Sequence, residues 1–142
     1  MRIPGRGLIG LAATVGAVLT LLVPAAAYAY FGTEVNQAAA VSGPSGDYVC
    51  VTPSTGVTVC FRPLGDDFFV KDTKADGYSA VAAWQMNGWE PRTGSCVNSL
   101  GAGKWGWCNK DLTEGRQLWI TEDRYDAGKF VDRGYDLLTT TT

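Results

Sequence analysis

Histidine does not occur anywhere in the 142 residues of the sequence. Its absence excludes Ser-His-Asp and Cys-His nucleophilic catalysis, acid-base catalysis by imidazole, and zinc sites with histidine ligands. The Ser-x-x-Lys motif of another group of nucleophilic enzymes is missing as well. The sequence therefore predicts no metal ion, no cofactor and no catalytic residue of these kinds.

A concentration of basic residues is also missing. Lysine and arginine together number 12, aspartate and glutamate 14, and the two signs alternate along the chain. A protein that reads a phosphate backbone needs a basic stripe, and one that binds anionic lipid needs a polybasic segment. We therefore expect no nucleic acid as a partner, and no membrane once the N-terminal segment described next has been removed.

Long hydrophobic runs are confined to the N-terminus. Two arginines precede an apolar run over residues 8–23, and the small-residue site Ala27-Tyr28-Ala29 follows. This order is that of a secretory signal peptide. We expect cleavage after Ala29, with cleavage after Ala27 as the alternative, and hence a secreted, extracellular protein. The other interpretation is an uncleaved membrane anchor, because the run is long enough to cross a bilayer.

Cysteine occurs only four times, which is too seldom for disulfides to replace a hydrophobic core. The spacings, with no CxxC pair, argue against zinc. Export favours oxidation, so we predict two local disulfides, Cys50 with Cys60 and Cys96 with Cys108, in preference to the two other connectivities that four cysteines allow. Each bridge of this span would stabilise the domain by roughly 3 kcal/mol.

Sustained helical periodicity is missing after residue 29. Short β-rich runs instead alternate with turn clusters at intervals of about ten residues. This pattern predicts an all-β fold, a small antiparallel sandwich or barrel of about 6–8 short strands. We expect a signal peptide over residues 1–29, a flexible leader over 30–46, a secreted β domain over 47–138 and a disordered tail over 139–142.

The first hairpin can be predicted with its register. Residues 48–52 and 57–61 are β-rich, and the intervening loop ends at Gly56, which can supply the left-handed residue after a type I turn. This register places Cys50 opposite Cys60, within reach of a disulfide. It puts the disulfide on one face of the hairpin and four apolar side chains on the core face. Those four are Val49, Val51, Val59 and Phe61.

Further along, residues 78–86 alternate so that Trp84 falls on an apolar face, which makes this run the best candidate for a central strand. Asn87-Gly88 is a hairpin turn signal. Residues 117–121 and 129–133 are predicted as two late strands.

Three of the five tryptophans are candidates for a binding surface. Trp89 follows a turn, and Trp105 and Trp107 point the same way across a glycine in a turn-rich segment. Exposed aromatic rings beside polar groups suit stacking on sugar rings or on a flat protein surface. In the alternative interpretation, the same rings cover the second disulfide and one end of the core.

Carboxylate chemistry is the enzymatic possibility that the missing histidine leaves open, because paired acidic residues can cleave glycosidic bonds. The candidates are Asp66, Asp67, Glu90, Glu114, Glu122 and Asp123. Asp72–Gly77 begins like a calcium loop but departs from it at two ligand positions, so an Asx turn at Asp76-Gly77 is the simpler interpretation. Gly101–Lys104 lacks the flanking residues of a phosphate loop and is predicted to be an ordinary flexible loop.

The run Lys71-Asp72-Thr73-Lys74-Ala75-Asp76-Gly77-Tyr78-Ser79-Ala80-Val81-Ala82, with segments 59–67, 96–98 and 105–111, resembles small secreted proteins of uncharacterised function from Streptomyces and related actinobacteria. The resemblance implies export and a source lineage, and it implies no activity and no site residues.

These observations favour a secreted, non-enzymatic binding domain that docks on an extracellular polysaccharide or a protein surface through Trp89, Trp105 and Trp107. A first alternative is an enzyme inhibitor or toxin-like protein that presents the segment between Cys96 and Cys108 to a secreted protein. A second alternative is a small carboxylate-dependent glycoside hydrolase.

Overall fold

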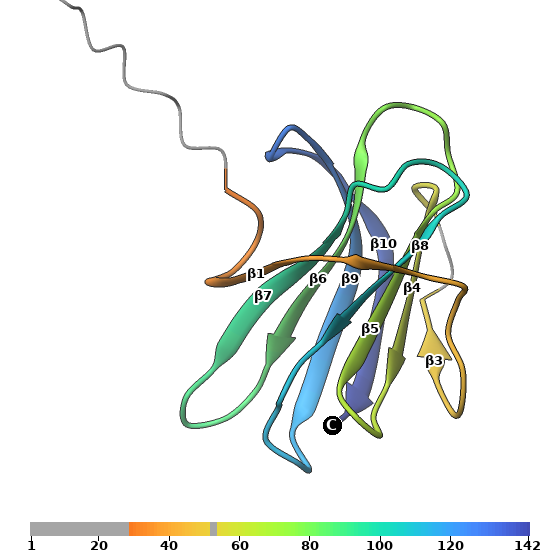
Figure 1. The fold of residues 1–142 in the computed structure, drawn as a ribbon. Coiled ribbons are helices and arrows are strands. Elements are labelled where there is room, and N and C mark those ends of the chain that lie inside the picture. The colour runs from red at the N-terminus through yellow and green to blue at the C-terminus, as the bar shows by residue number, and fades with distance from the viewer. Residues whose placement is uncertain (1–28, 52–53) are drawn as a thin grey trace, which may run out of the picture.

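A computed structural model describes residues 29–51 and 54–142, which form no helix. Their strands lie in two five-stranded sheets packed face to face, so the predicted all-β sandwich is confirmed (Figure 1). Sheet A has the order β1-β7-β6-β9-β10 and sheet B the order β2-β8-β5-β4-β3. The ten strands are β1 (Glu34–Gln37), β2 (Ala39–Val41), β3 (Val49–Cys50), β4 (Val57–Arg62), β5 (Asp67–Asp72), β6 (Ser79–Met86), β7 (Arg92–Asn98), β8 (Trp105–Asn109), β9 (Gln117–Asp126) and β10 (Lys129–Thr141).

The core lies between the sheets and follows the period-two alternation of the strands. Strand β6 occupies the centre of sheet A between β7 and β9, as predicted, and it places Trp84 in the core, stacked on Phe68 of the opposite sheet. Strands β4 and β5 add buried valines and phenylalanines from the other side. The alternation was therefore sufficient to identify the core face of β6.

The first hairpin has the predicted register. Val49 pairs with Phe61 and Cys50 with Cys60, and the Cys50–Cys60 disulfide is formed. Gly56 has a φ of +97°, the left-handed conformation that the predicted turn requires; the loop residues 52–53 lie outside the described part of the chain. The prediction that Val49 faces the core is wrong, because β3 is a two-residue edge strand and leaves Val49 41% exposed.

The second predicted disulfide, Cys96–Cys108, is also formed, and it joins the two sheets. Cys96 lies on β7 of sheet A and Cys108 on β8 of sheet B, and both are buried in the core. The first bridge instead connects neighbouring strands of sheet B. The two disulfides therefore hold different parts of the sandwich.

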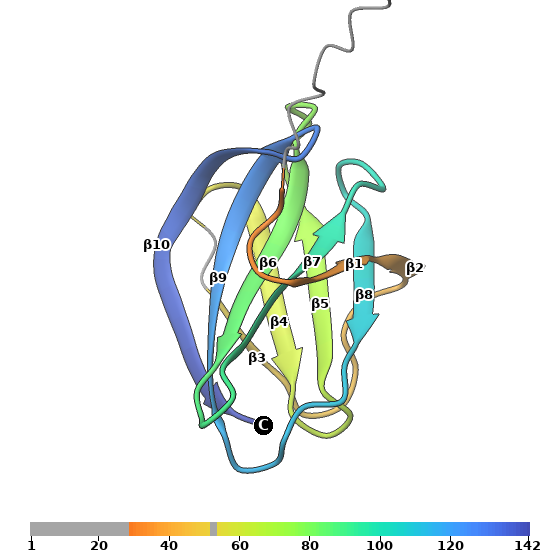
Figure 2. The same cartoon turned by 90° about the vertical axis from the view of Figure 1, so that its left-hand side faces the viewer.

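The flexible leader predicted over residues 30–46 is wrong for the strands β1 and β2. Strand β1 pairs in parallel with β7, and β2 pairs in antiparallel with β8, so this one segment forms an edge of both sheets (Figure 2). The segment has little apolar character, and backbone pairing with later strands orders it. It raises the strand number above the predicted range.

The disordered tail predicted over residues 139–142 is also wrong. Thr139, Thr140 and Thr141 continue β10 and pair with the first residues of β9, and Thr142 is buried. Threonine is a good strand former, and the neighbouring strand supplies the hydrogen bonds that a polar tail lacks by itself. The late strands are accordingly longer than predicted and are joined by a turn at Ala127–Gly128, where both residues have positive φ, as a type I′ hairpin requires.

The predicted signal peptide lies outside the described residues, apart from Ala29. Within the described ranges there is no helix long and apolar enough to cross a membrane.

Candidate functional site

The structure separates the three candidate tryptophans. Trp89 lies in the loop between β6 and β7 of sheet A, and its side chain is 96% exposed. Trp105 and Trp107 lie side by side on the outward face of β8 in sheet B and are half-buried. The rings therefore do not form a single platform, and Trp89 is the one that projects freely into solvent.

The β6–β7 loop and the β8–β9 loop lie at the same end of the sandwich (Figure 1). Trp89 borders a groove lined by residues of these two loops. The groove has a volume of about 490 Å³. Beside the indole, its lining is polar: Asn87, Arg116 and Gln117, with Gly88 and Gly115. Glu90 and Thr113 line a smaller adjoining hollow.

The groove's two walls are held by hydrogen bonds. The N–H of Asn87 donates to the carbonyl of Gln117 at 2.9 Å, which extends the pairing of β6 with β9. Met86 pairs with Arg92, so the predicted two-residue turn at Asn87-Gly88 is instead a longer loop over residues 87–91, and Trp89 lies in it. On the other wall, the N–H of Arg116 donates to Oγ1 of Thr142, which in turn donates to the carbonyl of Thr113 at 2.7 Å.

Trp105 and Trp107 take part in contacts within the protein. Nε1 of Trp107 donates to Oδ1 of Asp67 at 2.6 Å. The ammonium of Lys71 lies 5.6 Å from the centre of the Trp105 ring, and Gly43 of the β2–β3 connection lies against the same ring. These contacts engage both rings within the protein, on the outward face of sheet B, whereas the Cys96–Cys108 disulfide lies on the core side of β8.

Asp67 is the centre of a satisfied polar cluster on this outward face. Arg62 forms an ion pair with it, and Asn109 and Trp107 donate to its other carboxylate oxygen. Burial alone would raise the pKa of Asp67, but these three hydrogen-bond partners together lower it below its ordinary value. Each lone pair that such a carboxylate would offer to a substrate is engaged by the protein.

Asp66, next to it, points toward the β8–β9 loop. Its backbone has a φ of 52°, and its Oδ2 accepts the N–H of Leu112 at 2.7 Å. Burial raises the pKa of Asp66 in spite of this hydrogen bond. Asp66 therefore anchors a loop and does not pair with Asp67 across a cleft.

The remaining acidic candidates are also dispersed. Glu122 is fully buried on the core face of β9 and accepts two hydrogen bonds from Ser54, both at 2.6 Å. Asp123 is buried on the opposite face of β9, where Arg133 binds both of its carboxylate oxygens. Glu90 and Glu114 are exposed near the Trp89 groove. The structure thus engages the four buried candidates in separate contacts and leaves Glu90 and Glu114 exposed on the two loops beside the groove.

Asp72–Gly77 forms the predicted Asx turn. Oδ1 of Asp76 accepts the N–H of Tyr78 at 3.0 Å, and Oδ2 pairs with Arg124. Oδ1 of Asp72 accepts the N–H of Lys74. In the parts of the chain that the structure describes, no three His, Cys, Asp or Glu side chains gather in a way that could hold a metal ion.

One hollow was not predicted from the sequence. It lies on the outward face of sheet A, has a volume of about 220 Å³ and is bordered by Phe31, Gln85, Trp119 and Arg133. The alternation of β9, with Leu118 and Ile120 in the core, could have placed Trp119 on this face. No sequence signal placed Phe31 there, because the residue lies in the segment predicted to be flexible.

Comparisons with protein-family models, with curated proteins and with solved structures find no match to this chain. The functional argument therefore depends on the geometry of the exposed residues themselves.

Proposed function

We propose that the protein is a secreted, non-enzymatic binding domain that docks on an extracellular polysaccharide through Trp89 and the groove beside it. The single observation that carries the proposal is the 96% exposure of the Trp89 side chain on the rim of a groove lined with polar groups. An indole left in water loses the stabilisation that burial gives, and it gains that stabilisation when a sugar ring stacks on it.

The groove's chemistry suits a hydroxyl-rich ligand. Asn87 and Gln117 offer amide donors and acceptors, and Arg116 offers guanidinium donors, all on the walls beside the ring. An apolar face flanked by a few polar groups is typical of small-ligand sites. Because the groove is wide open to solvent, it suits a ligand that extends beyond it, such as a segment of a polysaccharide chain, better than an enclosed single sugar.

Export is the second part of the proposal. The signal-like N-terminus and the resemblance to secreted actinobacterial proteins support it. Both disulfides are formed, and disulfides persist in oxidising compartments outside the cytosol.

The test is co-sedimentation of the purified protein with insoluble cellulose, chitin and peptidoglycan. We expect Trp89→Ala to weaken binding by roughly tenfold or more, which corresponds to about 1.4 kcal/mol. Trp89→Phe should retain part of the affinity, because it keeps an aromatic face. Trp105→Ala and Leu64→Ala are the matched controls; Leu64 is 88% exposed on the β4–β5 turn and should not matter.

Binding that is equal in Trp89→Ala and the wild type would contradict the proposal, as would a wild-type protein that sediments with none of these polymers.

A second candidate function is the presentation of residues 99–104 to a partner enzyme. The loop is exposed yet braced: Nδ2 of Asn98 donates to the carbonyls of Val70 and Lys104, and the N–H of Gly103 donates to the carbonyl of Asp72. A rigid exposed loop loses little entropy on binding. Inhibition of a secreted hydrolase that is lost on Leu100→Ala would favour this candidate over polysaccharide binding.

A further inference from the structure

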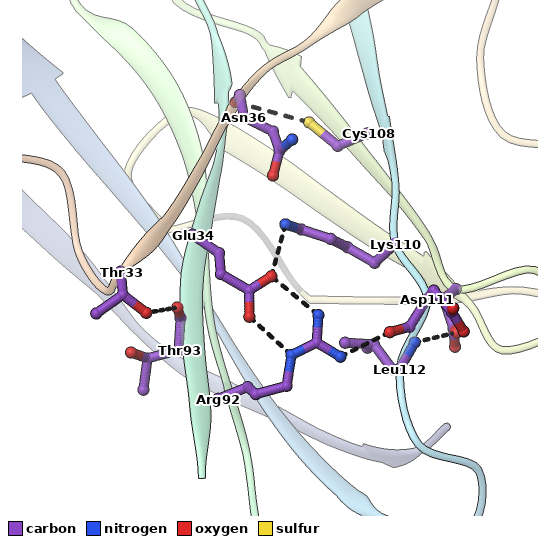
Figure 3. Close-up of polar contacts among 10 residues, drawn as sticks. Thr33, Glu34, Asn36, Arg92, Thr93, Cys108, Lys110, Asp111 and Leu112 are labelled. Atoms are coloured by element: carbon purple, nitrogen blue, oxygen red, sulfur yellow. Dashed lines mark hydrogen bonds and ion pairs between the residues drawn. The ribbon is translucent and has the colours of Figure 1, made fainter. Parts of the chain in front are cut away.

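Strand β1 brings a cluster of charged side chains to the opening between the two sheets (Figure 3). The carboxylate of Glu34 accepts hydrogen bonds from Nε and Nη2 of Arg92 at 2.7 and 2.9 Å. Nζ of Lys110, which follows β8, donates to Oε2 of the same carboxylate at 3.0 Å. Glu34 thus links the first strand of sheet A to the end of a strand in sheet B.

Lys110 is unusually enclosed for a lysine. Its side chain is only 10% exposed, and its ammonium lies 5.4 Å from the centre of the buried Trp84 ring. Lysine is rarely buried without a specific partner. Its amine is therefore held at one place, between the Glu34 carboxylate and an aromatic ring.

Asn36 is the third member of the group. It lies two residues after Glu34 on β1, so both side chains project from the same side of the strand. Oδ1 of Asn36 is buried and has no hydrogen-bond partner among the described residues. In Figure 3 the carboxamide of Asn36 points toward the ammonium of Lys110.

Strand register explains why Asn36 lies near the end of β8 that leads to Lys110. Strand β2 pairs with β8 through Ala39↔Trp107 and Val41↔Trp105. Continued backward along the chain, this antiparallel register would place Asn36 opposite Lys110. The chain passes into sheet A at this point but stays close to β8, because Sγ of Cys108 lies 3.8 Å from the carbonyl oxygen of Asn36.

We propose that Lys110 and Asn36 form an intramolecular isopeptide bond, with Glu34 as the proton carrier. The ammonium of Lys110 gives one proton to the Glu34 carboxylate, and the neutral amine attacks Cγ of Asn36. A bond forms between Nζ and Cγ. Glu34 returns a proton to Nδ2, the Cγ–Nδ2 bond breaks, and the side-chain nitrogen leaves as ammonia, which takes up the last proton as ammonium.

The reaction needs no oxidant, reductant or cofactor, and it requires the amine of Lys110 to approach the Asn36 carboxamide that points toward it. Two groups held in one orientation react as if at very high effective concentration. Hydrogen bonds from Arg92, and then from Lys110, lower the pKa of Glu34 from its ordinary 4.5 to about 2, against the opposing effect of burial. The carboxylate therefore starts the reaction ionised and able to accept a proton, but as a weak base, so the bond should form slowly after folding.

Mass spectrometry tests the proposal directly. The full chain is produced by a secreting host, incubated, reduced and alkylated, and its mass is compared with that of the chain starting at its observed N-terminus. We expect a deficit of one ammonia. After trypsin digestion, the peptide that contains Asn36 and ends at Lys71, since the Arg62–Pro63 bond resists trypsin, should be joined to the peptide 105–116, because the linked Lys110 also resists cleavage.

Lys110→Arg keeps the positive charge beside Glu34 but lacks the amine nucleophile, and Asn36→Ala removes the carbon that is attacked; both should abolish the deficit and the joined peptide. Glu34→Gln should slow the appearance of both. Asn87→Ser is the matched control, since an Asn-Gly pair can also lose ammonia by forming a ring with its own backbone. In this variant the deficit should persist.

A wild-type protein that keeps the full mass after prolonged incubation would overturn the proposal. So would a deficit that disappears in Asn87→Ser or persists in Lys110→Arg. If one of the variants does not fold, the joined peptide from the wild type still decides the question. The result is independent of polysaccharide binding, because Glu34, Asn36 and Lys110 do not line the Trp89 groove.

Discussion

Single carboxylates in this protein are stabilised by the donors around them. Asp67 is almost fully buried, a position that would expel a lone carboxylate into solvent or leave it protonated. Arg62, Trp107 and Asn109 together supply enough donors to keep it ionised. The Asp67 carboxylate therefore holds three side chains of the outward face of sheet B in place.

Asp67→Asn should make stability less dependent on pH. Because the folded-state pKa of Asp67 lies below its ordinary 3.8, the carboxylate stabilises the fold fully above that value. This contribution is lost as the pH falls through the lowered folded-state pKa. We expect the variant to be about 2 kcal/mol less stable near neutral pH, and the difference to shrink in acid.

Urea unfolding at a series of pH values measures this difference. Asp47→Asn changes an exposed carboxylate and is the control. A constant difference between Asp67→Asn and the wild type from neutral pH into strong acid would contradict the interpretation.

For single residues, the alternation of apolar side chains predicted which of them are buried only in strands where that alternation is uninterrupted. Trp84 could be assigned to the core because β6 alternates without interruption. The roles of Trp105 and Trp107 could not, since they depend on Asp67 and Lys71 from a strand that is far away in sequence. Trp89 was identified as a candidate from its turn, but the length of the loop that carries it is set by the pairing of Met86 with Arg92, which the turn signal did not predict.

Among the elements, the two disulfides differ in their surroundings more than in their spacing. In the first bridge Cys60 is buried but Cys50 is exposed at an edge strand, whereas in the second bridge both Cys96 and Cys108 are buried between the sheets. A reductant must reach the sulfur it attacks. The two bridges should therefore open in a fixed order.

We expect mild thiol treatment of the native protein to open Cys50–Cys60 first and to leave Cys96–Cys108 intact until the domain unfolds. Alkylation followed by peptide mapping identifies which cysteines have been freed. Replacing either pair with alanine should cost roughly 3 kcal/mol, and the loss should be larger for the inter-sheet pair because a core contact disappears as well. Simultaneous opening of both bridges would contradict this order.

The hairpin that carries the first disulfide was predictable because its turn, bridge and apolar pattern agree on one register. Strands β1 and β2 were not, since their partners come much later in the chain and their own composition is that of a leader. A strand ordered by its neighbours' hydrogen bonds carries little local signal.

For the whole molecule, one N-terminal segment covers an edge of each sheet. Strands β7 and β8 would otherwise be edge strands, with unpaired backbone groups open to another chain. The ion pairs of Glu34 with Arg92 and Lys110 hold this segment in place. The pairing of the outer edges of β7 and β8 thus depends on these first strands.

A variant without residues 30–41 should associate with itself, because both exposed edges can add strands from a second copy. Light scattering after size-exclusion chromatography measures this association over a range of concentrations. A deletion of residues 30–33 alone is the control, since it removes Tyr30 and Phe31 but keeps both strands. A monomeric protein of unchanged stability in the longer deletion would show that the segment is dispensable.

The parallel pairing of β1 with β7 also affects the order in which the strands pair during folding. Glu34 and Arg92 are 58 residues apart, so the chain must close a long loop before they can meet. Such distant pairings form late and slowly. The first strands of the domain to be synthesised would then be the last to pair. Until they do, the edges of β7 and β8 stay unpaired and the core is accessible along that side of the sandwich. If the residues before β1 are an export signal, its cleavage site lies close to β1 in the chain. The timing of cleavage can then govern when β1 pairs with β7 and the domain becomes complete.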